Sequence, residues 1–345
     1  MGQLFSSGEY TPPEVTSVVY PAFAAAQGPL TGKSFAVTGC TSGTGLVAAK
    51  LFAEKGAAKV FLLNRPSARA EAARAEISAA AAAGTVVTHV DCDLMDFGSV
   101  RAAAAAVRAA TGELDVLCNN AGVMALEDKA TKDGYDVQMQ TNHLSHFLLT
   151  KELFAALAAA AAKRGDARVV NHSSMSRKSP AVPMDAAAAA RYAGKNGGAL
   201  GGDGASMFRG GARWVRYHMT KLANVAFTLS LAEKCAASRS RSKANVRALC
   251  AAPGLAATQL QATTNVDGGM GSGTWFMRFA QSAEDGAVPL LTCCLSPDAK
   301  SGEFWEPAKG THGDATLTPL EPICLEADRA ALWAASEAAV GAWTP

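Results

Sequence analysis

Two observations along the 345-residue chain predict an α/β protein with a Rossmann-type, doubly wound parallel sheet. Short apolar runs alternate with helix-like segments from about residue 31 onward, as in repeated β–α–β units. A glycine-rich turn, Thr38–Gly45, follows the first apolar run and opens the first helical segment. Right-handed crossovers between parallel strands then give a sheet that is covered by helices on both faces.

The individual elements follow from apolar spacing and turn residues in chain order. Strands are expected at Ser34–Thr38, Lys59–Leu63, Val86–Val90, Leu114–Cys118, Ala167–Asn171 and Asn245–Cys250. Helices are expected at Gly43–Lys55, Ser67–Ala82, Phe97–Ala110, Gly134–Ala161 and Trp214–Cys235. Alanine runs such as Ala186–Ala190 favour helix, and we interpret them as compositional bias in surface helices.

The domain organisation predicted from these patterns is an N-terminal arm, residues 1–30, followed by a single domain, residues 31–345. The arm is expected to be irregular because prolines interrupt it at Pro12, Pro13, Pro21 and Pro29. Residues 177–213 form a long glycine-rich insertion before the helix that begins at Trp214. If the preceding strand end forms an active site, this insertion should cover the substrate pocket.

Composition excludes several classes of protein. The chain is 49% hydrophobic and 18% charged with a net charge of +2, so nothing argues for nucleic acid as a partner. No apolar run approaches the length of about 18 residues that spans a membrane. Eight scattered cysteines without zinc-type spacing indicate free, mostly buried thiols in a reducing, cytoplasmic compartment. We interpret the adjacent Cys293 and Cys294 as ordinary packing, with a redox or metal site as the alternative.

The N-terminus carries a pattern that bears on localisation. Met1-Gly2-Gln3-Leu4-Phe5-Ser6 fits the pattern for N-myristoylation of Gly2. A single acyl chain would give only weak, reversible association with a membrane surface. The alternative is a chance match in a tail that contains glycine and serine.

The glycine-rich turn has the composition of a phosphate-binding loop. Gly39, Gly43 and Gly45 lie directly after a strand and open a helix. A phosphate needs backbone N–H groups at a helix N-terminus with no Cβ in the way. The alternative is an ordinary tight turn.

Polar residues follow the next strands at the edge where ligands bind in open α/β sheets. The second strand ends Leu63-Asn64-Arg65, with no acidic residue to hold the ribose 2′-hydroxyl of NAD. Arg65 suits the 2′-phosphate of NADP instead, unless it is simply a solvated loop residue. Asp93 follows the third strand, and Asn119 and Asn120 follow the fourth, as site residues or as turn formers.

Tyr217 and Lys221 stand four residues apart on one predicted helix, so they share a helix face. A lysine ammonium beside a phenol favours the phenolate, and we expect the pKa of Tyr217 to lie below its usual value of about 10. Such a phenol suits acid/base catalysis of carbonyl–alcohol interconversion.

In this order, the motifs are similar to those of the classical short-chain dehydrogenases/reductases, and most similar to the retinol dehydrogenase and WW-domain-oxidoreductase-like group. The resemblance covers about residues 30 to 340. It rests on Thr38–Gly45, Asp93-Leu94, Asn119-Asn120-Ala121-Gly122, Asn142-His143-Leu144, Arg168–Ser174, Tyr217–Lys221, Pro253-Gly254 with Thr258, and a C-terminal stretch from Asp328 to Glu337.

The resemblance implies a role for each matched residue. The catalytic set would be Asn142, Ser174, Tyr217 and Lys221, with Tyr217 as the proton donor, Lys221 also on the ribose, Ser174 on the substrate carbonyl and Asn142 holding a relay water. The cofactor would contact Gly39, Thr41, Ser42, Gly43, Thr44, Gly45, Arg65, Asp93, Leu94, Asn119, Ala121, Gly122, Pro253, Gly254 and Thr258, besides Tyr217 and Lys221. Among these, Asp93 would touch the adenine, Asn119 would stand near the adenine ribose, and Pro253, Gly254 and Thr258 would line the nicotinamide. Thr44 departs from the pattern, since an isoleucine is common there.

The sequence therefore predicts an NADP(H)-dependent oxidoreductase, with NAD(H) as the less favoured cofactor, acting on an apolar aldehyde, ketone or retinoid-like substrate. Homo-oligomers are an expectation from the resemblance alone. Two alternatives stay open: a pigment reductase like the protochlorophyllide reductases, and a non-catalytic subunit that binds nucleotide. No metal site is expected, because His143, His146, His172 and His218 lack clustered partner ligands and are interpreted as packing or surface residues.

Overall fold

The fold is described by a computed structural model, which covers residues 15–178, 183–202, 204, 211–242, 244–258, 260, 280–320 and 326–345. The Gly2 pattern and Cys324 lie outside this part of the chain. One eight-stranded sheet has the order β3-β2-β1-β4-β5-β6-β7-β8. Its strands are β1 Ser34–Thr38, β2 Lys59–Asn64, β3 Val86–Asp91, β4 Val116–Asn119, β5 Ala167–His172, β6 Val246–Ala251, β7 Phe304–Pro307 and β8 Ala315–Leu317.

The sheet confirms the predicted doubly wound architecture. Strands β1 to β7 pair in parallel, and only the edge strand β8 is antiparallel, against β7. The order runs outward from β1 in one direction and from β4 in the other. The reversal between β1 and β4 is where such sheets bind ligands, at the carboxyl ends of the strands.

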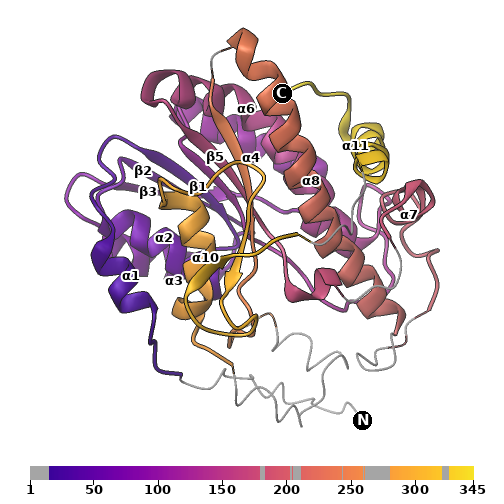
Figure 1. Cartoon of the computed structure of the whole chain (residues 1–345), viewed down its shortest axis with the longest axis horizontal. Coiled ribbons are helices and arrows are strands. Elements are labelled where there is room, and N and C mark those ends of the chain that lie inside the picture. Colours follow the sequence, from indigo (N-terminus) through magenta and orange to yellow (C-terminus); the bar gives the residue numbers. More distant parts are fainter. Residues whose placement is uncertain are drawn as a thin grey trace.

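Helices cover both faces of the sheet (Figure 1). Their bounds are α1 Tyr20–Ala26, α2 Gly43–Glu54, α3 Ala68–Ala80, α4 Phe97–Ala110, α5 Val137–Met139, α6 Ser145–Arg164, α7 Ala186–Tyr192, α8 Ala212–Ser242, α10 Ala283–Leu295 and α11 Glu326–Val340. Helices α1, α2, α3 and α10 pack on one face, and α4, α6 and α8 on the other. Helices α7 and α11 lie against each other outside α8.

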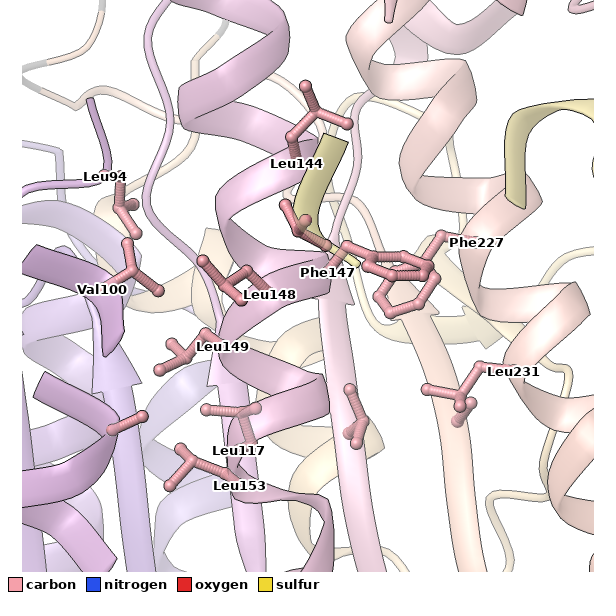
Figure 2. Close-up of a cluster of buried hydrophobic side chains, with 14 of the residues drawn as sticks. Leu94, Val100, Leu117, Leu144, Phe147, Leu148, Leu149, Leu153, Phe227 and Leu231 are labelled. Carbon is pink, nitrogen blue, oxygen red and sulfur yellow. The ribbon is translucent and has the colours of Figure 1, made fainter. Parts of the chain in front are cut away.

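The larger hydrophobic core lies between the sheet and α4, α6 and α8 (Figure 2). Leu148 and Leu149 of α6 are fully buried there, as is Leu117 of β4. Phe147 packs against Phe227 of α8, with the two rings tilted and their centroids 5.2 Å apart. Full burial of side chains of this size stabilises the fold by about 1.5–3 kcal/mol each.

Several element boundaries differ from the sequence prediction. The predicted helical segment Gly134–Ala161 is present with shifted bounds: the chain becomes helical only at Val137, where Asp136 caps the N–H groups of Gln138 and Met139, and it stays helical to Arg164. A π-helical turn, η1 Gln140–Leu144, then separates α5 from α6. Helix α8 is longer than predicted at both ends. Strands β7 and β8 were not predicted, because their short segments carry no clear alternation.

The expectation of an irregular arm is wrong for residues 20–26, which form α1. Pro21 is tolerated because it stands in the first turn, where its missing N–H has no helical partner. The segment before α1 is held by Asp285 of α10. The Asp285 carboxylate accepts hydrogen bonds from the Ser17 hydroxyl and from three backbone N–H groups, those of Val18, Val19 and Tyr20.

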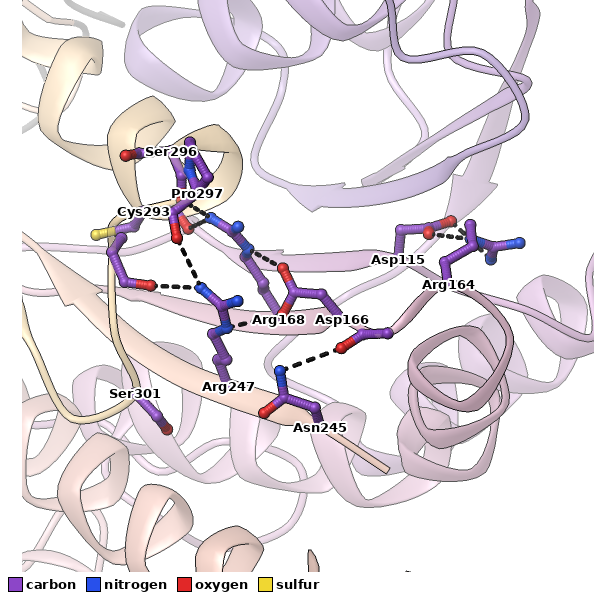
Figure 3. A network of polar contacts seen from close by, with 12 residues as sticks. Asp115, Arg164, Asp166, Arg168, Asn245, Arg247, Cys293, Ser296, Pro297 and Ser301 are labelled. Carbon is purple, nitrogen blue, oxygen red and sulfur yellow. Dashed lines mark hydrogen bonds and ion pairs between the residues drawn. The ribbon is translucent and has the colours of Figure 1, made fainter. Parts of the chain in front are cut away.

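The C-terminus of α10 is fixed by two arginines, one buried and one half-buried, at the edge opposite the carboxyl ends of the strands (Figure 3). Arg168 of β5 donates to the carbonyl oxygens of Cys293 and Ser296 at 3.0 and 2.8 Å. Arg247 of β6 donates to the Pro297 carbonyl, and Asp166 pairs with both guanidinium groups. Cations at a helix C-terminus compensate its unpaired carbonyls and its dipole.

One helical stretch in the described residues, Val137–Arg164, is long and apolar enough to cross a membrane. The expectation that no segment reaches this length and composition is therefore wrong. However, 67% of its most apolar stretch is buried within the protein, as expected of a helix in the core. The seven described cysteines are free and buried, which confirms the predicted thiols, and Cys293 and Cys294 pack inside the α2–α10 layer.

Candidate active site

The glycine-rich turn at the end of β1 leaves no room for side chains. Gly39 and Gly43 have φ angles of +71° and +60°, which favour glycine. A Cβ on Gly45 would lie 2.3 Å from the Gly39 carbonyl oxygen and 2.4 Å from Asn120 Nδ2. The turn leads into the N-terminus of α2, so its shape fits the diphosphate of a dinucleotide.

Asn120 joins this turn to the ends of the two neighbouring strands. Its Nδ2 donates to the carbonyl oxygens of Thr38 and Gly39 at 3.0 and 3.2 Å. Its Oδ1 accepts from the Thr44 hydroxyl at 2.9 Å and contacts His172 Nδ1 at 2.8 Å. Sequence reasoning noticed Asn120 without giving it a role, and Thr44, which departs from the family pattern, is explained by this contact.

Asn119, predicted near the adenine ribose, is buried beneath the site. Its Nδ2 donates to Thr150 Oγ1 and to Asn171 Oδ1 at 3.1 and 2.9 Å, and the residue is 1% exposed. Asn171 in turn donates to the Thr228 hydroxyl. The side chain of Asn119 thus links β4 to β5 and α6, and it is not available for the predicted cofactor contact.

The residues predicted around the adenosine lie at the ends of β2 and β3. Arg65 is exposed directly after β2, and Asn64 turns inward to accept the Cys40 N–H at 2.7 Å. Arg69, in the first turn of α3, donates to the Ser42 hydroxyl at 3.3 Å, and sequence reasoning missed it. Asp93 is half-buried and accepts the Met95 N–H, while Leu94 is buried.

The first turns of α8 present Tyr217 and Lys221 side by side, as predicted. The Lys221 ammonium lies 5.7 Å from the centre of the Tyr217 ring and donates to the His172 carbonyl at 3.1 Å. The Ser173 hydroxyl donates to the Lys221 carbonyl at 2.7 Å. Helix α8 is therefore hydrogen-bonded to the end of β5 at the level of Ser174.

The expected lowering of the Tyr217 pKa is wrong. Burial raises the pKa of the phenol to about 12, and a hydrogen bond with Ser174 opposes this only in part. Burial also lowers the pKa of Lys221 to about 8. The prediction counted the attraction between the two groups and omitted the cost of charging either of them at 3% and 4% exposure.

Asn142 lies in the π-helical turn, facing the end of β4. Its Oδ1 accepts the Val123 N–H at 2.8 Å, and its Nδ2 donates to the Val123 carbonyl and the Thr220 hydroxyl, both at 2.9 Å. A Cβ on Gly122 would lie 3.2 Å from Asn142 Oδ1 and 3.4 Å from Lys221 Nζ. The structure thus brings Gly122, Asn142 and Lys221 together.

Two buried histidines flank Asn142 and hold the π-helical turn. His146 Nδ1 contacts the Asn142 carbonyl at 3.1 Å, and its Nε2 contacts the Thr38 hydroxyl at 3.0 Å. Because Nδ1 faces a carbonyl oxygen, it carries the ring proton, and Nε2 is the acceptor for the Thr38 hydroxyl. Burial lowers the pKa of His146 to about 4, which keeps the ring neutral. No metal-binding group of three or more ligands occurs in the described part of the chain.

The loop after β6 completes the carboxyl edge. Gly254 has a φ of +66°, and a Cβ there would lie 2.4 Å from the Thr311 carbonyl oxygen. The Pro253 carbonyl accepts from Gln281 Nε2 at 2.7 Å. Thr258 lies over Gly43, whose Cβ would be 3.3 Å from Thr258 Cγ2. The predicted residues 253–258 therefore face the glycine-rich turn across the end of the sheet.

An apolar cluster surrounds the Tyr217 ring. Met124, Ala125 and Trp214 are buried with it, and Leu260 packs against them. The Trp214 and Tyr217 rings meet edge to face at 6.0 Å. Ala125 has a φ of +53°, the one positive value in a described residue other than glycine. Strained backbone of this kind clusters at functional sites.

The described part of the insertion is packed against the protein instead of forming one long loop. It contains α7, which lies on α11, and a glycine-rich stretch whose Gly198 and Gly201 N–H groups bind the Asp128 carboxylate. Arg216, next to Tyr217, donates to the carbonyls of Gly201 and Gly202. Residues 179–182, 203 and 205–210 lie outside the described part, so coverage of the substrate pocket stays a prediction.

Comparison with known proteins identifies the family of the chain. The family model for short chain dehydrogenases matches residues 33–196. Retinol dehydrogenase 12 of Homo sapiens is 31% identical over 287 residues, 82% of this chain and 80% of that protein. Retinol dehydrogenase 11 of Mus musculus is 30% identical over 79% of this chain and 76% of that protein.

Solved structures of short-chain dehydrogenases/reductases share the fold of this chain. A crystal structure from Mycobacterium paratuberculosis covers 96% of this chain and 100% of its own, with a TM-score of 0.67 and 29% identity. The 3-ketoacyl-(acyl-carrier-protein) reductase of Brucella melitensis, complexed with NADH, covers 80% of this chain and 97% of its own. Its TM-score of 0.56 at 24% identity supports the fold alone. The chain belongs to the short-chain dehydrogenase/reductase family of oxidoreductases and is similar to the retinol dehydrogenases within it.

Proposed function

We propose that the protein is an NADP(H)-dependent oxidoreductase that interconverts an apolar carbonyl compound and its alcohol. The observation that carries the proposal is the position of Tyr217 and Lys221 on α8 against the end of β5, where Lys221 donates to the His172 carbonyl and the Ser174 side chain lies beside the Tyr217 phenol. The glycine-rich turn, a cradle that a Cβ would fill, lies at the same edge of the sheet.

The residues divide the chemistry as follows. NADPH, when bound, supplies the hydride that adds to the carbonyl carbon. As negative charge develops on the carbonyl oxygen, the hydroxyls of Ser174 and Tyr217 donate to it, and a proton passes from Tyr217 Oη. A phenol with a pKa near 12 is fully protonated at neutral pH, which suits a proton donor. Lys221 would hold the ribose and stabilise the phenolate that remains.

The preference for NADP(H) rests on the end of β2. No carboxylate stands there to accept the 2′-hydroxyl of NAD, since Asn64 is turned inward to Cys40. Arg65 is exposed, and Arg69 reaches the glycine-rich turn through Ser42. Either guanidinium would pair with a 2′-phosphate. Arg65→Ala should therefore weaken binding of NADPH more than binding of NADH. Fluorescence titrations of the protein with each nucleotide measure the two Kd values.

The substrate class follows from the cluster around Tyr217. Trp214, Met124 and Leu260 make the wall beside the phenol apolar, so they favour an apolar aldehyde or ketone. The similarity to retinol dehydrogenase 12 adds retinal-like aldehydes to this class.

The test is oxidation of NADPH by the purified protein with a panel of apolar aldehydes and ketones, including retinal, with Tyr217→Phe as the control. Turnover that is lost in Tyr217→Phe would support the proposal. Tight binding of NADPH without turnover of any substrate would instead support a non-catalytic subunit. Turnover only with bound pigment in light would support a pigment reductase.

A further inference from the structure

Arg177 carries one of the largest fully buried side chains among the described residues. It lies in the short 3-10 helix η2, Met175–Lys178, three residues after Ser174. The residue is 1% exposed, and its partner Glu306 on β7 is 5% exposed. Nη1 donates to Glu306 Oε2 at 2.9 Å and Nη2 donates to Oε1 at 3.2 Å, a bidentate pair. The guanidinium also lies 3.9 Å from the centre of the Phe304 ring.

The pair acts on the backbone of Ser174. Arg177 Nη1 donates to the Ser174 carbonyl at 3.3 Å, and the Arg177 N–H donates to the same oxygen at 3.1 Å. The Ser174 hydroxyl, on the other side of this residue, accepts the Ser176 N–H at 3.2 Å. The orientation of Ser174 is therefore set by η2, and η2 is fixed to β7 through Glu306.

Stability alone does not account for this arrangement. Desolvation offsets most of the attraction within a buried ion pair, and an apolar pair of similar size is often as stable. A buried bidentate pair does fix geometry, because a guanidinium and a carboxylate fit in one orientation. Strand β7 also supports the loop after β6, since a Cβ on Gly254 would lie 2.9 Å from Pro307 Cγ. The same strand end thus touches the loops that carry Ser174 and Pro253.

We propose that Arg177 and Glu306 are positioning residues, which hold the Ser174 hydroxyl in place to meet the substrate carbonyl beside Tyr217. This inference rests on the proposed function, since it assigns Ser174 to the substrate. Neither Arg177 nor Glu306 needs to touch the cofactor or the reacting atoms. Arg177→Met keeps most of the buried volume and removes the guanidinium, and with it the contacts to Glu306, to the Ser174 carbonyl and to the Phe304 ring.

The decisive experiment combines Arg177→Met with Ser174→Ala in a double-mutant cycle. If Arg177 acts through Ser174, Arg177→Met lowers kcat by about 10²-fold, as expected for a misplaced catalytic group. The same change lowers kcat no further in the Ser174→Ala background. The Kd for NADPH stays unchanged in all variants. If Arg177→Met lowered kcat by the same factor in the wild-type and the Ser174→Ala backgrounds, or if it raised the Kd for NADPH in parallel, the proposal would be overturned.

Arg168→Met is the matched control for loss of a buried arginine. Arg168 is also buried, at 6% exposure, and pairs with the half-buried Asp166, but it lies at the opposite edge of the sheet. The Arg168→Met substitution should lower the midpoint of thermal unfolding without lowering kcat. If Arg177→Met fails to fold, Glu306→Gln, which keeps the shape and weakens the pair, takes its place in the cycle. A kcat loss in Arg168→Met as large as that in Arg177→Met would contradict a specific role.

Hydrogen exchange separates this inference from the proposed function. Arg177→Met should speed amide exchange over residues 173–178 by at least about tenfold and leave residues 217–221 unchanged, since loss of a support opens structure locally. This readout needs no substrate, so it holds even if no carbonyl compound is turned over. Unchanged exchange over residues 173–178 would contradict the idea that Arg177 holds this segment. Faster exchange with an unchanged kcat would contradict the idea that this positioning matters for catalysis.

Discussion

His143 donates from Nε2 to the Ser336 hydroxyl at 2.9 Å, so the π-helical turn that carries Asn142 is tied to the C-terminal helix α11. The Ser336 hydroxyl donates its own proton to the Leu332 carbonyl at 2.8 Å, which leaves His143 as the donor. His143 Nδ1 has no hydrogen-bond partner, so this is the one hydrogen bond of a ring that is 1% exposed.

Ser336→Ala should therefore lower the free energy of unfolding by about 1–3 kcal/mol, because it leaves a buried N–H without an acceptor. Urea unfolding followed by circular dichroism measures this. Ala338→Ser, on the exposed side of the same helix, should change it by less than about 0.5 kcal/mol. Equal unfolding midpoints for Ser336→Ala and the wild type would show that the hydrogen bond contributes nothing.

Stability should fall as the pH is lowered from about 6.5 toward 4. Burial lowers the pKa to about 3 or 4 in four histidines: His143, His146, His172 and His218. The unfolded chain binds protons near pH 6.5 and the folded chain does not, so each residue contributes up to about 1.4 kcal/mol per pH unit below that value. Asp136 works in the opposite direction, because burial raises its pKa to about 6 and the folded state takes up a proton first.

Urea midpoints at pH 7.5, 6 and 5 test this dependence. The described interactions of His218 are ring contacts with Trp214 and Tyr217, which a phenylalanine can also make. His218→Phe should therefore reduce the slope of unfolding free energy against pH by about one proton. The exposed His312 is the control, and His312→Asn should leave the slope unchanged. A midpoint that is constant from pH 7.5 to 5 would contradict the neutral, buried state of the four rings.

NADPH binding should weaken as the pH rises through about 8, where Lys221 loses its charge. Below that pH the ammonium is available to the ribose, and above it one charge-assisted hydrogen bond is lost. Fluorescence titrations at pH 7 and 9 give the Kd, and Lys221→Met should abolish the difference. Lys234→Met removes a lysine further along α8, near Trp333, and should preserve it. The same Kd at both pH values in the wild type would rule out Lys221 as a ligand of the nucleotide.

Gly45→Ala should abolish nucleotide binding at concentrations that saturate the wild type. Its Cβ would lie 2.3 Å from a backbone oxygen of the same turn, so the turn must open. Gly112→Ala is the matched control, because nothing lies within 4 Å of a Cβ there. Isothermal titration with NADPH measures both variants, and normal binding by Gly45→Ala would remove the glycine-rich turn from the site.

The fold was predictable because strands and helices alternate with clear punctuation, and six of the eight strands were placed to within two residues. The glycine-rich turn and the Tyr217–Lys221 pair were predictable because their chemistry depends on spacing along the chain. The roles of Asn120, His146 and Arg177 were not, since each depends on partners more than 20 residues away. The pKa of Tyr217 was misjudged for a similar reason, because spacing reveals a neighbouring charge but not the degree of burial.

The hydrogen bonds from Ser17–Tyr20 to Asp285 place this segment next to the loop after β6, which is proposed to line the nicotinamide. Gly286, the next residue, is so close to the loop after β6 that a Cβ there would lie 2.6 Å from Ala256 Cβ. Val15 also packs with Leu255 and Ala257 of that loop. Proteolytic clipping after Tyr20 would therefore remove a support of the loop after β6 at the proposed site, and a bulky fusion partner just ahead of Ser17 would disturb the same support.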